Sequence, residues 1–157
     1  MCTIIKVFIS HKKEDELLAV LVKHALDKKQ ISSYLDVLDN EIVNDGKALT
    51  DHIKENLNSC TDVIVVMTES TKKSWWVPFE IGMSAQKNMP TATFLISDVK
   101  LPDYLSYWPR LKDLDDIATY IDVRLSFNGN ILEHYGLSSA GKVDTHAFYQ
   151  KLKQKLR

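Results

Sequence analysis

The sequence VIVVM at residues 63–67 is the strongest strand signal in the chain, because four of its five residues are β-branched and all are apolar. Such a continuous run is typical of a strand buried on both faces of a parallel sheet. The sequence IIKVFIS at residues 4–10 has the same character and predicts a second buried strand. Amphipathic stretches separate the apolar runs, which is the pattern of a parallel sheet covered by helices on both faces. The fold class is therefore predicted to be α/β.

The other predicted elements continue this alternation on either side of residues 63–67. Further strands are predicted at residues 33–36 and 91–96, and residues 117–123 are the candidate for a fifth. Helices are predicted after residues 11–14, around 49–57, over 75–87 and over 145–156. Residues 36–46 and 126–144 are expected to form long loops.

Two of the predicted helices have clear apolar rows, which are expected to face the sheet. The rows are Leu17, Leu21 and Ala25 with Leu18, Val22 and Leu26 in the first helix, and Phe148, Leu152 and Leu156 in the last.

The composition indicates one soluble globular domain over residues 1–157, since 45% of the residues are hydrophobic and 26% charged. The formal charge of −1 lacks the basic excess typical of nucleic-acid binding. No apolar run approaches a membrane span, and residues 1–10 do not resemble a signal peptide, so a cytoplasmic protein is expected. Cys2 and Cys60 form no CxxC pattern, and the five histidines show no ligand spacing, so neither a disulfide framework nor a metal site is predicted.

Several common α/β functions are excluded by missing motifs. The chain has five glycines and contains neither the GxxxxGK[ST] loop of P-loop NTPases nor the GxGxxG loop of Rossmann dehydrogenases. The GxSxG motif of α/β-hydrolases is also absent. Residues 67–69 read MTE, where a receiver domain needs an acceptor aspartate.

Polar side chains follow the predicted strands, at the edge of the sheet where open parallel sheets bind ligands. Ser10, His11 and Lys12 follow the first strand, Asp36 ends the second, and residues 68–74 follow the third. These residues are expected to line one crevice. For each there is a simpler interpretation, since Ser10 can cap the turn, Lys12 can be solvated and Asp36 can make a local turn bond.

The densest local signal is SWWVPFEIG at residues 74–82, in which two tryptophans precede a glutamate. A tryptophan pair is often core, and a glutamate in a first helical turn is favoured by the helix dipole alone. On a helix, however, Trp76 and Glu80 would share a face and present a stacking plane beside an acid, which suits a flat cationic ring. Pro78 disfavours helical geometry at Val77, so a later helix start would loosen this spacing.

The chain resembles a TIR (Toll/interleukin-1 receptor) domain, specifically the stand-alone bacterial kind found in antiphage defence. The resemblance rests on VFISH at residues 7–11 with Glu14-Asp15, YLDV at 34–37 and Gly46-Lys47, which matches the end of the family's BB loop. Residues 76–80 are similar to the Trp-x-x-x-Glu segment whose glutamate is catalytic in TIR enzymes that cleave NAD.

The resemblance implies a flavodoxin-like fold with about five parallel strands, and an enzyme that cleaves the nicotinamide–ribose bond of NAD+. Glu80 would be the catalytic residue, and NAD+ would be a substrate, with no permanently bound cofactor. The residues expected to bind NAD+ are Ser10, His11, Lys12, Asp36, Lys47 and Trp76. At Ala48 some family enzymes carry an aromatic residue that packs on the ligand, and here that contact would come from elsewhere.

The chemistry agrees with a single acid, because cationic nicotinamide leaves without protonation and a carboxylate can stabilise the ribosyl oxocarbenium-like transition state. The resemblance also implies self-association and a cyclic or conjugated nucleotide product for a separate effector in a Thoeris-like defence system. The alternative is a non-catalytic TIR interaction module. Glu80 beside Trp76 favours the enzyme, because a scaffold has no need of a carboxylate in the crevice.

Overall fold

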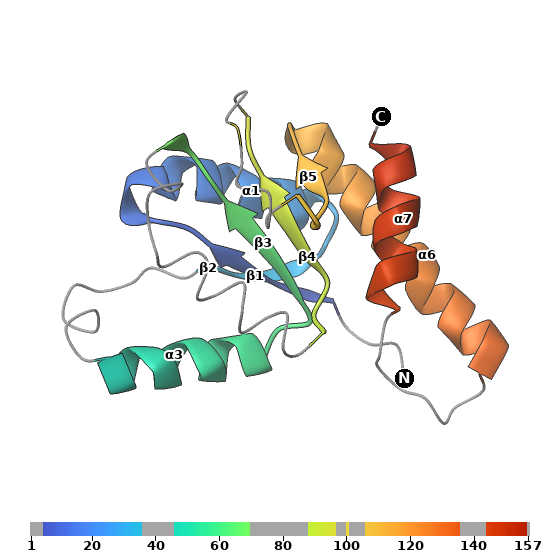
Figure 1. Cartoon of the computed structure of the whole chain (residues 1–157), viewed down its shortest axis with the longest axis horizontal. Helices are drawn as coiled ribbons and strands as arrows, with labels where there is room; N and C mark the ends of the chain where they lie inside the picture. The colour runs from blue at the N-terminus through green and yellow to red at the C-terminus, as the bar shows by residue number, and fades with distance from the viewer. Residues whose placement is uncertain are drawn as a thin grey trace.

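A five-stranded parallel sheet forms the centre of the computed structural model, which describes residues 5–35, 46–69, 88–96, 100, 106–135 and 144–156 (Figure 1). Within those residues the sheet order is β2-β1-β3-β4-β5. The strands are β1 (Lys6–Ser10), β2 (Ser32–Leu35), β3 (Asp62–Val66), β4 (Thr91–Phe94) and β5 (Arg110–Leu111). The predicted α/β class and the parallel sheet are confirmed.

Strand β1 lies between β2 and β3, and the register places Phe8 beside both Tyr34 and Val63. In this order the chain leaves β1 toward one edge of the sheet and leaves β3 toward the other. The carboxyl ends of β1 and β3 therefore form a topological switch point, where doubly wound sheets bind their ligands.

Alternate side chains of the strands enter two separate cores, one on each face of the sheet. Val7, Ile9, Ile64 and Val66 belong to the larger core. Phe8, Val63 and Val65 belong to the smaller one. All are fully buried, which explains why the strands of the sequence are apolar without interruption.

Helices cover both faces (Figure 1). The larger core is closed by α1 (Glu16–Lys28), α6 (Leu114–Tyr135) and α7 (Thr145–Lys155). The smaller core is closed by α3 (Gly46–Asn58), through Ile53 and Leu57. A short 3-10 helix, η1 (Lys13–Asp15), connects β1 to α1.

One predicted apolar row of α1, the outer row of Leu17, Leu21 and Ala25, faces the core through Ala25 alone. Leu17 is 83% exposed and Leu21 43% exposed, whereas Ala19, Val22 and Leu26 are buried. Each residue advances roughly 100° around a helix, so a buried arc centred on Val22 leaves Leu17 and Leu21 outside it.

Two predictions in the last third of the chain are wrong. Residues 117–123, the candidate fifth strand, lie in α6, where Ile117, Tyr120 and Ile121 pack into the larger core. The fifth strand is instead the two-residue β5, which is too short to leave a pattern in the sequence. Residues 126–135 of the expected loop also belong to α6. The helix predicted over residues 75–87 lies outside the described residues.

Helix α7 is positioned by polar contacts as well as by its predicted apolar row. Phe148 and Leu152 are buried and Leu156 packs against them, so this row is confirmed. The Asp144 carboxylate caps the helix by accepting from the Ala147 amide at 3.1 Å. The Tyr149 hydroxyl accepts from the Thr91 amide of β4 at 2.9 Å, which ties the helix to the sheet.

Candidate functional site

The candidate site lies where β1 and β3 end side by side. Ser10, the last residue of β1, pairs with Val65 of β3, so His11 and Thr68 follow at the same edge. Ser10 has no exposed area and His11 is almost fully buried. Of the three residues predicted after β1, Lys12 is the one that is only partly buried.

A tight turn follows at Lys12. The Lys12 backbone is extended and its carbonyl accepts from the Asp15 amide at 2.9 Å, which closes the first turn of η1. This bond fixes the position of Lys12 relative to Asp15. The structure thus brings Ser10, His11 and Lys12 together as one short loop at the switch point.

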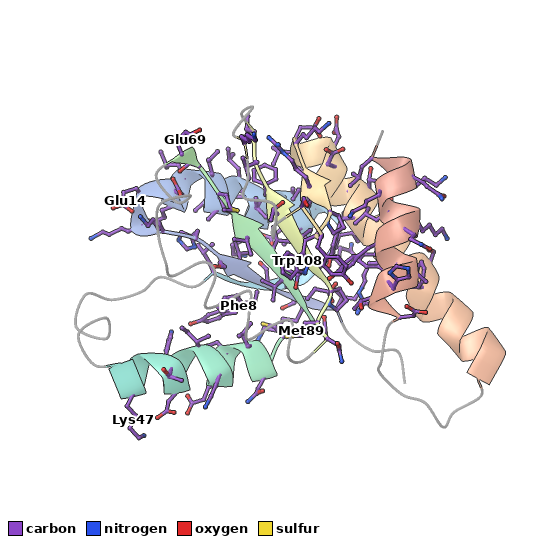
Figure 2. The ribbon with its side chains drawn as sticks, viewed as in Figure 1. Phe8, Glu14, Lys47, Glu69, Met89 and Trp108 are labelled. Carbon is purple, nitrogen blue, oxygen red and sulfur yellow. The ribbon has the colours of Figure 1, made fainter. Side chains whose placement is uncertain are left out.

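The Asp15 carboxylate connects this loop to the end of β3. The Thr68 hydroxyl lies 2.9 Å from Oδ1 of Asp15 and 3.1 Å from Oδ2, so it donates a bifurcated, charge-assisted hydrogen bond. Figure 2 shows Glu14 and Glu69, the neighbours of this pair, at one end of the sheet. Asp15 is only 6% exposed, whereas Thr68 is partly exposed, so the carboxylate accepts this bond at the edge of the interior.

Lys47 lies apart from this loop, in the first turn of α3. Its ammonium group is 2.7 Å from Oδ2 of Asp51, and its side chain is largely exposed. The hydrogen bond and the charge of Asp51 raise the pKa of Lys47 and lower the pKa of Asp51. Figure 2 shows Lys47 at the outer end of α3, away from Glu14 and Glu69. A role of Lys47 in binding NAD+ stays a prediction.

Asp36, Trp76 and Glu80 lie outside the described residues. The topology nevertheless fixes which strand ends they adjoin along the chain. Asp36 directly follows β2, while Trp76 and Glu80 belong to the connection that leaves the carboxyl end of β3 and returns to β4.

A second polar cluster lies at the opposite end of the sheet, where β3 begins. Oδ2 of the buried Asp62 accepts from Tyr120 at 2.6 Å and from Nε of Arg124 at 2.8 Å. Oδ1 accepts from Thr61 at 2.7 Å. Burial and the negative charge of Asp62 raise the pKa of Tyr120 well above its usual value. This cluster is closed to ligands and holds α6 against the sheet.

The Asp15–Thr68 contact was not predicted from the sequence, although Asp15 lies in the connection that follows β1 and Thr68 in the connection that follows β3. The contact could have been predicted from the sequence because both residues lie in connections that follow adjacent strands. A carboxylate that is buried there needs a hydrogen-bond donor. Within the described ranges, no group of three or more histidine, cysteine, aspartate or glutamate side chains could hold a metal ion. In the same ranges, no helix is both long and apolar enough to cross a bilayer.

The sheet order and the switch-point loop define a flavodoxin-like α/β protein. A family model described as TIR domain matches residues 7–132, and the chain therefore belongs to the TIR domain family. Among solved structures, the TIR domain of the Toll-related receptor TRR-2 from Hydra magnipapillata superposes with a TM-score of 0.55 at 18% identity. That match covers 81% of this chain and 94% of the other, and it supports the fold. No curated protein matches this chain.

Proposed function

We propose that this protein is a TIR enzyme that cleaves the nicotinamide–ribose bond of NAD+. The TIR family includes both NAD-cleaving enzymes and scaffold adaptors. The observation that carries the proposal is the switch point itself. The loop of Ser10, His11 and Lys12 and the connection containing Glu80 leave the carboxyl ends of two adjacent strands, where a dinucleotide bridging them would find cations and an acid.

The different burial of Ser10, His11 and Lys12 suggests a different role for each in binding NAD+. Ser10 and His11 would form the floor of the NAD+ site, because both residues are buried. Lys12, which is partly exposed, would reach the phosphates with its ammonium group. Asp36 would orient a ribose hydroxyl, Lys47 would approach from the BB-loop side, and Trp76 would stack against the nicotinamide or wall the site.

Glu80 would supply the catalytic charge. As nicotinamide leaves, positive charge develops on the ribose ring, and a carboxylate beside it stabilises the transition state. Exclusion of water would favour attack by an internal nucleophile, giving a cyclic product, whereas entry of water would give ADP-ribose. We propose a cyclic or conjugated ADP-ribose-derived signal, made in the cytoplasm and read by a separate effector in a Thoeris-like antiphage system.

The deciding experiment incubates the purified protein with NAD+ at high protein concentration and resolves the products by chromatography and mass spectrometry. Glu80→Gln keeps the shape of the side chain and removes its charge, so it is expected to lower nicotinamide release at least a hundredfold, as for loss of one transition-state donor, on the order of 10². Glu55→Gln makes the same change on the exposed side of α3 and is expected to match wild type.

The same assay over a range of protein concentrations tests self-association. A site completed across copies predicts that specific activity rises with protein concentration. A constant specific activity would remove that part of the proposal. Intact NAD+ in every sample, assembled samples included, would overturn the enzyme and favour the non-catalytic interaction module.

A further inference from the structure

We infer that Asp15 and Thr68 are positioning residues that join the two loops of the crevice and set where Lys12 stands. The consequence for NAD+ rests on the proposed function, whereas the contact itself is a property of the fold. The evidence is the 2.9 Å and 3.1 Å approach of the Thr68 hydroxyl to a buried carboxylate on the other side of the switch point.

The placement of Asp15 sets it apart from an ordinary helix cap. Asp15 occupies the N-cap position of α1, where an aspartate usually accepts from the amides of the first turn. Its side chain makes no such capping bond. The carboxylate instead faces Thr68, which lies 53 residues further along the chain. Because the Asp15 carboxylate bonds Thr68 and not the first-turn amides, it joins the segment after β1 to the segment after β3.

The contacts form a continuous path from the sheet to Lys12. The Met67 amide donates to the Phe94 carbonyl at 3.0 Å, which anchors the chain just before Thr68 to β4. Thr68 then holds the Asp15 carboxylate, and the Asp15 amide holds the Lys12 carbonyl at 2.9 Å. A rigid sheet thus fixes a residue of the first loop through a residue that leads toward Glu80.

This path predicts a distinctive kinetic effect. Lys12 would contact phosphate oxygens, which are remote from the bond that breaks. A less firmly held Lys12 would therefore weaken the binding of the substrate and of the transition state equally. Loss of such uniform binding raises KM and leaves kcat nearly unchanged. A variant that merely unfolds part of the protein lowers the active fraction and does not move KM.

The test compares Thr68→Val, which removes the hydroxyl at nearly constant volume, with Thr68→Ser, which keeps it. Thr119→Val, on the hydroxyl that bonds the Asp115 carbonyl within α6, is the matched control. Thr68→Val is expected to raise the KM for NAD+ about tenfold, with kcat changed less than about threefold, as for one charge-assisted hydrogen bond. Thr68→Ser and Thr119→Val are expected to stay within about twofold of wild type in KM.

Amide hydrogen exchange of the free protein provides a readout that needs no activity. Thr68→Val is expected to speed exchange at residues 12–16 about tenfold and to leave β1 unchanged. Unchanged exchange together with unchanged KM would overturn the inference. If wild type does not cleave NAD+, the proposed function fails, and the exchange result alone then decides the inference. If Thr68→Val does not fold, Asp15→Asn is measured instead, with the same direction of change expected.

Discussion

At the scale of single residues, the carboxylate of Asp62 is a charged group that is buried without exposed area and needs hydrogen-bond donors in place of water. It is satisfied by Tyr120, Arg124 and Thr61 at distances of 2.6 to 2.8 Å. A buried charge with several donors is tolerated because the donors replace its hydration. Removing one donor leaves the desolvation cost in place.

Loss of the cation in the Asp62–Arg124 pair is therefore expected to cost far more stability than loss of Lys29 from its exposed pair with Asp122, which links the end of α1 to α6. Arg124→Met should lower the free energy of unfolding by about 3 to 5 kcal/mol, because the carboxylate loses its cation. Lys29→Met should cost less than about 1 kcal/mol. Urea unfolding followed by circular dichroism measures both, and equal losses would contradict this account.

At the scale of elements, the sequence predicts secondary structure correctly where its hydrophobic pattern fits one type of element and no other. Residues 63–67 are apolar throughout because β3 is buried on both faces, and β3 is found there. Residues 117–123 are also mostly apolar, but a short apolar run fits a buried helix as well as a strand. Here Ile117 and Ile121 are one helical turn apart in the core. Strand β5 was missed because two residues carry no periodicity.

In helix α1, the contribution of a buried leucine to the free energy of unfolding can be compared with that of an exposed one. Leu26→Ala is expected to lower the free energy of unfolding by about 2 to 5 kcal/mol, because the side chain is fully buried. Leu17→Ala, the same change on the exposed row, is expected to fall within about 0.5 kcal/mol of wild type. Thermal and urea unfolding provide the comparison. A large loss for Leu17→Ala at low protein concentration would mean that the outer row is covered within one chain.

At the scale of the whole molecule, the amino ends of the strands attach helices to the sheet, whereas the carboxyl ends lead into the candidate site. The amino ends of β3 and β4 are bonded to α6 and α7 through Asp62, Tyr120 and Tyr149. The carboxyl ends of β1 and β3 lead into the loop of Ser10, His11 and Lys12 and into Thr68. The sequence predicts which residues follow each strand, and the sheet order β2-β1-β3-β4-β5 places the residues after β1 and β3 side by side. The sequence does not reveal the contact between Asp15 and Thr68, because separate loops meet there only after the sheet has formed.

Alkaline pH is expected to weaken the amino-end contacts. Burial raises the pKa of Tyr149 to about 12. The folded protein therefore keeps a proton that the unfolded chain loses near its ordinary value of 10, so this contribution is full below about pH 10 and is lost between about pH 10 and 12. In urea unfolding from pH 7 to 11.5, Tyr149→Phe should be less stable at neutral pH by about 1 kcal/mol and should lose less stability on alkalinisation. Parallel stability curves for the two proteins would contradict this.

The central position of β1 also has a consequence for biosynthesis. Strand β1 leaves the ribosome before β2 and β3, and in the folded protein it is hydrogen-bonded to β2 on one edge and to β3 on the other. The β1-α1-β2 unit is synthesised before β3, so the second edge of β1 stays unpaired until residues 62–65 have emerged. Until then the nascent chain presents the edge of an apolar strand to its surroundings, where it is open to pairing with other chains.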